Sequence, residues 1–535
     1  MNKKIDILLS TIIVFGLAML AGCSALPGQD EAGLAGSTLG VSMKADRFWP
    51  TEGWQVSTPE AQGMDGALLD QMMKFVDENQ IAVDSVLVVR NGTLVFETYR
   101  NGYGADSRHH LQSATKSVTS ALVGIALREG LIASVDQTMV DFFHDRNIEN
   151  LDARKQAITL ENLLTMSDGM DWHELDYPYN DPRNTLGQMW TSRDALQHIL
   201  DQPMAREPGE QWAYNSGTSM LLGGIVEKVS GQDLLVFARE QLFDPIGIGT
   251  VDWDKTVSGY YHSDGGLYMT PRDMARFGYL MLNQGTWEGR EILTPEWVDA
   301  STRTYYDTGN GTGYGYQWWT FPDMQAYSAH GHYEQWIVVV PEADLVVVFT
   351  GNIPDEAVHP INTMLLRYIL PSVQDLPDSL LTRQYAGHGL TLDYPAEYIQ
   401  LETPLPGNDA VTDVGGMVQL YLQWYPSEVA QITWEQAISG ISAEEWLADL
   451  FERMPAEGLV MGEALPERIL VSGDEASVYP FSAELPDESY SGLAALWRSN
   501  AQERFYLVIY LEGGSRPAMD FTGKLRGFLE SLSFS

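Results

Sequence analysis

The chain has 535 residues, of which 44% are hydrophobic, and it includes 15 tryptophans and 25 tyrosines. A chain of this length and apolar content can bury more than one hydrophobic core. Its formal net charge is -41, from 73 acidic and 32 basic residues. Because this charge repels phosphate backbones and anionic lipid surfaces, we expect no binding to nucleic acid.

The amino terminus has the pattern of an export signal. Two lysines precede an apolar stretch over 7–18, which is too short to span a bilayer comfortably. The segment Leu20-Ala21-Gly22-Cys23 then supplies the small residues of a bacterial lipoprotein cleavage site. Cys23 is the only cysteine, which fits a residue retained for lipidation rather than for a disulfide. We predict a signal peptide over 1–22 and a lipid anchor at Cys23, outside a bacterial membrane. A signal peptide with an incidental cysteine is the alternative.

The first predicted structural elements follow a flexible segment. Residues 23–45 are rich in alanine, glycine and serine, as in a tether. Two runs of β-branched and apolar residues, 85–90 and 93–97, then flank Asn91-Gly92. Asn-Gly between such runs is typical of a tight β-hairpin.

Ser113 and Lys116 stand three residues apart at the start of a segment, 117–127, with apolar residues at helical spacing. On a helix they share one face. A serine nucleophile needs a neighbour that takes its proton and a site that stabilises the oxyanion. We expect burial to lower the pKa of Lys116 and so to make it a base. The alternative is a helix cap followed by a lysine that extends to solvent.

Tyr214-Asn215-Ser216-Gly217 lies where a loop opens a second helix, ahead of the apolar run 220–222. If Tyr214 faces Lys116, the ammonium is expected to lower the pKa of the phenol and to make Tyr214 an alternative general base. Which of the two is the primary base stays open. The other interpretation is a core tyrosine with a satisfied hydroxyl.

Other catalytic patterns are missing from the sequence. It contains no Gly-x-Ser-x-Gly elbow, no His-Glu-x-x-His helix, no phosphate-binding glycine loop and no paired cysteines. His109-His110 lack a suitably spaced carboxylate, and a polar loop explains the cluster 171–174. The serine, lysine and tyrosine already supply the roles of a zinc ion. We therefore predict neither a metal nor a cofactor.

The later part of the chain predicts two more strands and a second domain. Strands over 336–340 and 345–350 flank a turn at 341–344. Prolines become frequent after Pro371, which indicates a boundary. Beyond it the patterns predict strands over 417–424 and 505–511 and helices over 444–454 and 521–532, as in an α+β domain of about 150 residues.

Four ordered blocks resemble the serine β-lactamase and penicillin-recognising superfamily, and within it class C-like esterases, peptidases and 6-aminohexanoate-dimer hydrolases. The blocks are residues 110–117, 163–170, 207–216 and 270–278. The resemblance covers about 46–375 and implies an α/β (α+β) fold. Its early and late strands are expected to join one antiparallel sheet, with a mostly helical lobe over about 110–300 and the active site between the two.

This resemblance also implies a third active-site element, a Lys-Thr-Gly or His-x-Gly triplet on a strand. Its best counterpart is His330-Gly331-His332, although His332 and Glu334 depart from the pattern. The backbone N–H groups of Ser113 and of a residue near Tyr333 are expected to form the oxyanion hole. The two histidines can also be partly exposed strand residues without a catalytic role. Ser216 replaces the asparagine common in Tyr-x-Asn, which disfavours β-lactam hydrolysis and favours an esterase or amidase.

Together these observations predict four segments: 1–22 signal peptide, 23–45 tether, 46–375 serine hydrolase domain and 376–535 accessory domain. The predicted function is an exported, lipid-anchored hydrolase that forms an acyl-enzyme at Ser113 and cleaves small esters or short amides. The alternatives are D-alanyl peptidase or β-lactamase activity, or a non-catalytic lipoprotein that binds the cell envelope. The oligomeric state, the role of the second domain and the exact substrate are not predicted.

Overall fold

The fold was analysed in a computed structural model, which describes residues 47–377 apart from 310 and 355–359, and shorter segments between 380 and 534. The predicted signal peptide, the tether and Cys23 lie outside the described residues. The chain divides into two compact units, one within Gly40–Pro377 and one that contains Asp378–Ser535. Each unit is treated by itself below.

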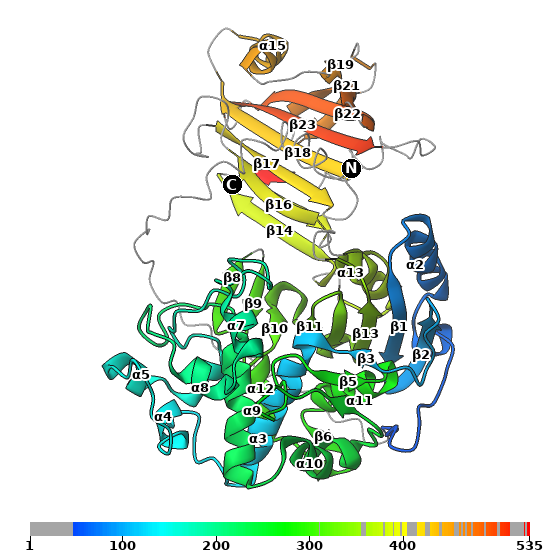
Figure 1. Cartoon of the computed structure of the whole chain (residues 1–535). Helices are drawn as coiled ribbons and strands as arrows, with labels where there is room; N and C mark the ends of the chain where they lie inside the picture. The colour runs from blue at the N-terminus through cyan, green and yellow to red at the C-terminus, as the bar shows by residue number, and fades with distance from the viewer. Residues whose placement is uncertain are drawn as a thin grey trace. The chain divides into compact units, whose positions relative to one another are not determined.

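An eight-stranded antiparallel sheet forms the frame of the first unit (Figure 1). Strands from the start of the unit pair directly with strands from its end, since β1 hydrogen-bonds to β13. This confirms the predicted joining of early and late strands. In spatial order the strands are β2 (Thr93–Tyr99), β1 (Val83–Arg90), β13 (Leu345–Gly351), β12 (Gln335–Val340), β11 (Ala326–Gly331), β10 (Trp319–Phe321), β9 (Thr312–Tyr314) and β8 (Tyr306–Gly309).

The predicted hairpin is β1 and β2, joined at Asn91-Gly92. Both turn residues have left-handed φ values, 52° and 77°, as a two-residue turn that matches strand twist requires. All eight residues of β1 are buried, because the strand is paired on both sides and covered on its faces. A Cβ added at Gly92 would lie 2.4 Å from the Tyr279 hydroxyl, so glycine is also required by packing.

Most helices lie between β2 and β8, as predicted. The longer ones are α3 (Thr115–Arg128), α9 (Ser216–Ser230) and α11 (Pro271–Leu282), while α2 (Gly66–Glu78) precedes the sheet. The shorter ones are α4 (Met139–Phe142), α5 (Ala153–Ala157), α6 (Leu160–Leu164), α7 (Thr185–Thr191), α8 (Ala195–Leu200), α10 (Leu234–Ala238), α12 (Pro295–Thr302), α13 (Pro360–Thr363) and α14 (Leu370–Ser372). Two small sheets are added, a three-stranded one of β3 (His109–His110), β5 (Leu267–Met269) and β4 (Asp252–Trp253) and a two-stranded one of β6 (Thr286–Trp287) and β7 (Arg290–Glu291).

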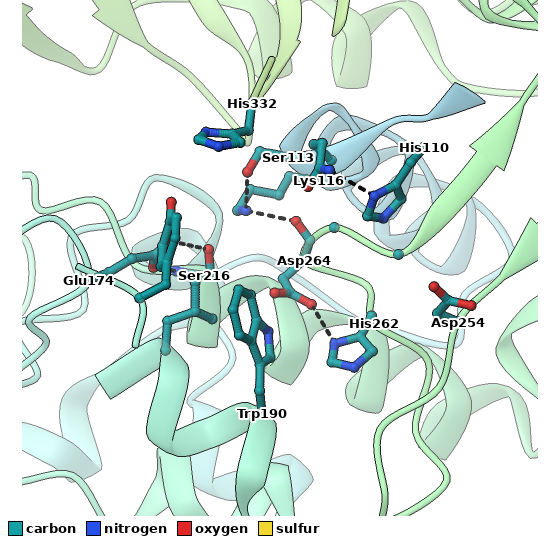
Figure 2. Close-up of a pocket in the computed structure, with 15 residues that line it drawn as sticks. His110, Ser113, Lys116, Glu174, Trp190, Ser216, Asp254, His262, Asp264 and His332 are labelled. Carbon is teal, nitrogen blue, oxygen red and sulfur yellow. Dashed lines mark hydrogen bonds and ion pairs between the residues drawn. The ribbon is translucent and has the colours of Figure 1, made fainter. Parts of the chain in front are cut away.

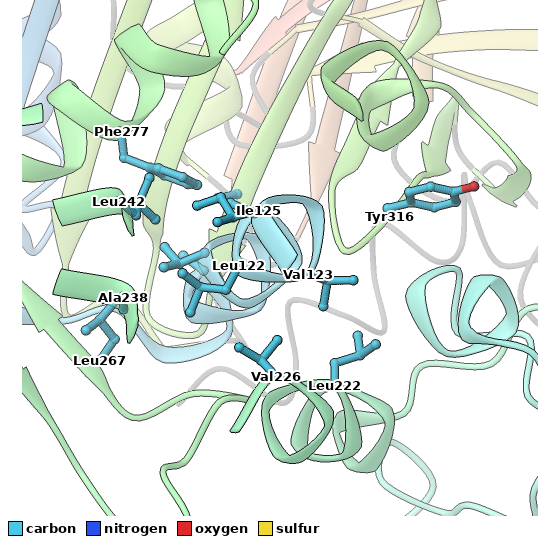
Figure 3. Packing of buried hydrophobic residues seen from close by; sticks show 14 of the residues in the cluster. Leu122, Val123, Ile125, Leu222, Val226, Ala238, Leu242, Leu267, Phe277 and Tyr316 are labelled. Atoms are coloured by element: carbon cyan, nitrogen blue, oxygen red, sulfur yellow. The ribbon is translucent and has the colours of Figure 1, made fainter. Parts of the chain in front are cut away.

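Helix α3 is the centre of the hydrophobic core (Figure 3). Its residues 115–126 are all buried, so the helix is enclosed on every side rather than on one face. Leu122, Val123 and Ile125 point in different directions from its axis, and α9 packs beside it through Leu222 and Val226. This enclosure fixes the position of the residues at the amino end of α3, which include Lys116.

The second unit is also α+β. A three-stranded sheet contains β14 (Thr382–Gly387), β15 (Leu390–Pro395) and β24 (Leu532–Phe534). A larger sheet contains β16 (Tyr398–Thr403), β17 (Gly415–Leu422), β18 (Glu428–Gln436), β23 (Arg504–Gly513), β22 (Glu488–Ser499), β21 (Asp474–Leu485) and β19 (Leu459–Met461), with β20 (Arg468–Val471) paired to β21.

Helix α15 (Ala443–Arg453) covers one face of the larger sheet through Trp446, Leu447 and Leu450. The strands predicted over 417–424 and 505–511 are β17 and β23, and the helix predicted over 444–454 is α15. The helix predicted over 521–532 falls mainly outside the described residues, and its last residue begins β24. Among the helices that the structure describes, none has both the length and the apolar content to cross a membrane.

Candidate active site

Ser113 lies on a single 3-10 turn, Gln112–Ala114, immediately before α3 begins at Thr115. The serine therefore precedes the first turn of the helix in which it was expected. Gln112 adopts a left-handed φ of 51°, an uncommon conformation for a residue other than glycine. Its side-chain Nε2 lies 2.8 Å from His110 Nδ1, which ties the turn to the preceding strand β3.

Lys116 contacts Ser113 as predicted. Its Nζ donates to Ser113 Oγ at 2.9 Å and to the backbone carbonyl of Asp264 at 2.7 Å. The side chain is enclosed in the core, with 2% of the residue exposed. Lys116 therefore has a fixed position beside the nucleophile and cannot extend to solvent, which excludes the alternative of a solvent-directed lysine.

Tyr214 joins this pair from a distant part of the sequence. It immediately precedes the cap of α9, where the Asn215 side chain accepts a hydrogen bond from Gly217 N. Lys116 Nζ lies 5.1 Å from the centroid of the Tyr214 ring, and Ser113 and Lys116 both act to lower the pKa of the Tyr214 phenol. The ring stacks on Trp319, with 6.1 Å between centroids. The three predicted residues therefore meet at one point.

The expected pKa shifts of Lys116 and Tyr214 were both wrong in direction. Burial by itself lowers the pKa of Lys116, but the interactions of Lys116 with Tyr214, Glu174 and Asp264 outweigh burial and raise the pKa above its ordinary value. Burial also raises the pKa of Tyr214, and the opposing effects of Lys116 and Ser113 do not cancel it. At neutral pH the free site therefore holds an ammonium beside a neutral phenol.

Ser113 and Lys116 open onto a cavity of ≈ 250 Å³ (Figure 2). Its apolar and aromatic lining residues are Tyr179, Leu186 and Trp190. The remaining lining residues are His110, Gln112, Glu174, Ser216, Asp254, His262, Asp264, Gly265, Gly266 and His332. The nucleophile is thus accessible to a small molecule with both apolar and polar parts.

Glu174 lines this cavity. Sequence reasoning missed it, because it was assigned to a polar loop. It is 3% exposed and accepts hydrogen bonds from Ser216 N at 2.8 Å, Ser216 Oγ at 2.6 Å and Trp172 Nε1 at 2.9 Å. Burial raises its pKa, although the charge of Lys116 opposes this. A glutamate two residues after a tryptophan was the only signal in the sequence, and burial could not be inferred from it.

Asp264 is a second residue of the site that sequence reasoning missed. Its backbone carbonyl holds Lys116, and its carboxylate lies 3.3 Å from His262 Nδ1. This contact and the charge of Lys116 bring the pKa of Asp264 below its usual value despite burial, which alone would raise it. No spacing rule identifies a backbone carbonyl as a ligand of a lysine more than a hundred positions away.

The triplet His330-Gly331-His332 lies at the end of β11, against the Ser113 turn. A Cβ added at Gly331 would lie 2.2 Å from the Leu111 carbonyl oxygen, so only glycine permits this approach. His332 lines the cavity, whereas His330 packs on Trp336 with 4.1 Å between ring centroids.

Tyr333 is 37% exposed and lies outside the cavity lining, with a left-handed φ of 61°. The expectation that a backbone N–H near Tyr333 completes an oxyanion hole with that of Ser113 concerns main-chain groups, which these side-chain positions do not test. That role stays a prediction.

Within the described residues, no three His, Cys, Asp or Glu side chains gather as metal ligands. His110 stacks on Tyr268, with 4.6 Å between ring centroids. In the cluster 171–174, His173 pairs with Asp171 at 3.1 Å and with Asp176 at 2.7 Å.

Comparison with known proteins agrees with this geometry. The β-lactamase family model matches residues 67–369, more than half of the chain. A 6-aminohexanoate-dimer hydrolase of Paenarthrobacter ureafaciens is 26% identical over 302 residues, which cover 52% of this chain and 74% of that protein. A lovastatin esterase of Penicillium rubens is 27% identical over 158 residues, covering 26% of this chain and 38% of the esterase.

Among solved structures, a Bacillus anthracis protein that carries the provisional name of a 6-aminohexanoate-dimer hydrolase superposes with a TM-score of 0.51. The two are 22% identical, and the match covers 62% of this chain and 89% of that one. This likeness concerns the fold alone. It agrees with the predicted combination of an antiparallel sheet and a helical lobe.

Proposed function

Because this chain belongs to the β-lactamase family of serine hydrolases, which includes esterases, amidases and D-alanyl carboxypeptidases, we propose that it hydrolyses small esters or short amides through an acyl-enzyme at Ser113. One observation carries the proposal. Lys116 Nζ donates a hydrogen bond to Ser113 Oγ and lies 5.1 Å from the centroid of the Tyr214 ring, beside an open cavity.

The reaction has two halves. In acylation, Ser113 Oγ attacks the substrate carbonyl carbon while its proton passes to the Lys116–Tyr214 pair, after this pair has lost one proton to solvent. The tetrahedral oxyanion collapses, the bond to the alcohol or amine breaks, and the pair returns the proton to the leaving group. In deacylation, water replaces the leaving group, attacks the ester of Ser113 and gives a proton to the pair. The bond between the acyl carbon and Ser113 Oγ then breaks, the carboxylic acid leaves, and the pair returns the proton to Ser113 Oγ.

The cavity limits the size of the substrate. A volume of ≈ 250 Å³ is near the lower end for sites that enclose drug-sized molecules. Tyr179, Leu186 and Trp190 offer an apolar surface for a short acyl or alkyl chain. These features support small esters and amides over long polymers.

Covalent labelling tests the nucleophile. We expect a fluorophosphonate probe to label the peptide that contains Ser113, and Ser113→Ala to abolish the labelling. Ser120→Ala is the matched control, since Ser120 lies on the same helix and its buried hydroxyl has no hydrogen-bond partner. Labelling of Ser113→Ala at the wild-type rate would reject the assignment.

We also propose that the protein is exported and anchored by lipid at Cys23, on the basis of the leader sequence alone. Expressed with its own leader, the wild type should incorporate labelled palmitate and fractionate with membranes. Cys23→Ser should lose the label. An unlabelled, freely secreted wild type would contradict the anchor and leave the hydrolase assignment untouched.

A further inference from the structure

The hydrogen bonds between Glu174 and Ser216 have a fixed direction. Glu174 Oε2 accepts from Ser216 N and from Trp172 Nε1, and Glu174 Oε1 accepts from Ser216 Oγ at 2.6 Å. Glu174 and Ser216 are 3% and 1% exposed. The two N–H donors and the charge of Lys116 favour the ionised form of Glu174 against the effect of burial, and an ionised carboxylate can only accept hydrogen bonds. The single proton of the Ser216 hydroxyl is therefore directed at Glu174.

The direction of this hydrogen bond determines whether Ser216 can donate to a substrate or only accept from it. A serine oxygen that has committed its proton has only lone pairs left, so toward the cavity Ser216 acts as an acceptor. The asparagine that Ser216 replaces would present both an N–H donor and a carbonyl acceptor. A substrate carbonyl or carboxylate placed against Ser216 would face another acceptor, with the charge of Glu174 directly behind it.

The charges around the rest of the cavity also disfavour a substrate carboxylate. Among the described residues, Lys116 is the only lysine or arginine that lines it, and Lys116 is engaged with Ser113 and Asp264. Figure 2 shows Glu174 and Ser216 on one side of the nucleophile and Asp254 on the other. Among these lining residues a substrate carboxylate would find no lysine or arginine other than Lys116, and His262 is already paired with Asp264, whereas an ammonium would find acceptors and negative charge.

We propose that Ser216 and Glu174 form an acceptor subsite, which selects esters or amides that carry a protonated amine and disfavours those that carry a carboxylate at the same place. The inference rests on the proposed hydrolase function at Ser113 and adds the substrate class.

Three acetate esters of similar length test the proposal, made from 5-aminopentanol, hexanol and 6-hydroxyhexanoic acid. At about pH 8 the first is a cation, the second is neutral and the third is an anion. We expect the kcat/KM of the wild type to fall in that order, with at least a tenfold difference between cation and anion, as for a charge-assisted hydrogen bond.

Glu174→Gln reverses the hydrogen bond at nearly constant shape. The glutamine carbonyl can keep the bonds from Ser216 N and Trp172 Nε1, while its NH₂ group donates to Ser216 Oγ. The freed hydroxyl can then donate toward the cavity. We expect the ratio of cation to anion kcat/KM to fall about tenfold or more. Changes that affect all three esters equally, such as an altered pKa of Lys116, cancel in this ratio.

Asp176→Asn is the control, because Asp176 lies two residues from Glu174 on the same loop, pairs with His173 and does not line the cavity. It removes the same charge and should leave the ratio within about twofold. If Glu174→Gln does not fold, Ser216→Ala can be used instead. It removes the acceptor oxygen of Ser216 and should also lower the ratio of cation to anion kcat/KM.

A readout without turnover separates this inference from the hydrolase assignment. Pentylammonium should slow fluorophosphonate labelling of Ser113 more than pentanoate does, and Glu174→Gln should reduce the difference. The subsite is overturned if the wild type hydrolyses the cationic and anionic esters with equal kcat/KM. It is also overturned if neither Glu174→Gln nor Ser216→Ala changes the ratio of these two values. In either case, labelling of Ser113 by the probe would still identify it as the nucleophile. If the folded wild type is neither labelled by the probe nor able to hydrolyse the esters, both proposals are overturned together.

Discussion

Lys116 is placed between two hydrogen-bond acceptors and three negatively charged or ionisable groups, and this environment controls its protonation. Burial alone would favour the neutral amine, but Tyr214, Glu174 and Asp264 favour the ammonium. Tyr214 stays neutral because burial raises the pKa of its phenol. The two groups must therefore lose one proton together before they can accept the proton of Ser113.

Substitution of either group should slow acylation. Lys116→Ala and Tyr214→Phe are each expected to lower the rate of acylation by about 10² to 10⁴, the usual effect of positioned proton transfer. The double variant should lose little more than the worse single variant, because the groups act as one unit. Stopped-flow measurements with an activated ester check this, and near-wild-type turnover of Tyr214→Phe would remove the tyrosine from the mechanism.

We expect kcat/KM to increase with pH. Because the pKa values of Lys116 and Tyr214 are both raised, the reactive form of the pair increases with pH, and kcat/KM should rise from neutral into alkaline solution. Glu174→Gln removes a negative charge that raises both pKa values, so the rise should move to lower pH. A profile that is flat over about pH 6 to 9 in the wild type would contradict this prediction.

At the scale of elements, strand β11 contacts the Ser113 turn more closely than a side chain permits. Gly331 lies against the Leu111 carbonyl and within 3.0 Å of Ala114 N, measured from an added Cβ. The strand also positions His332 at the cavity. The expected oxyanion site would lie between these two elements.

Gly331→Ala tests this contact. The added methyl group would force β11 away from the turn, and a displacement of about 1 Å at a catalytic site can reduce the rate by about 10²-fold. We expect a loss of that order in kcat/KM, with a destabilisation of about 1 to 3 kcal/mol from overpacking, measured by urea unfolding. Gly104→Ala is the control, since a Cβ there meets open space. Equal activity of the two variants would show that the close approach has no functional role.

At the scale of the whole molecule, every residue of the candidate site lies within the unit Gly40–Pro377. The second unit has its own core, in which Trp434, Trp497 and Tyr506 are buried between strands. A unit with its own core can be expected to fold independently. The predicted boundary between 375 and 376 stays a prediction.

A truncated chain that ends at Pro377 tests this division. It should retain labelling of Ser113 and hydrolysis of a small activated ester, with some loss of stability. Circular dichroism and thermal unfolding would verify that it folds. A well-folded truncation that no longer reacts with the probe would mean that the second unit completes the active site. Loss of activity toward larger substrates alone would instead assign the second unit a role in binding.

The sequence by itself determined the fold class, the hairpin at Asn91-Gly92 and the family, and it identified Ser113, Lys116 and Tyr214 as candidates. These features depend on short-range patterns, such as turn residues, strand alternation and motif spacing, which remain visible without any long-range contact. The confirmed family resemblance and hydrolase class came from the same short blocks.

Only the tertiary structure decided the electrostatics of the site. Glu174 and Asp264 act on Lys116 from segments that lie 58 and 148 positions away, and with Tyr214 they raise its pKa against the effect of burial, while burial raises the pKa of Tyr214. The depth of burial and the charges that meet inside a fold depend on the packing of distant segments, so no local pattern encodes them. For the same reason the direction of the Ser216 hydroxyl, and with it the expected preference for cationic substrates, could be inferred only from the folded chain.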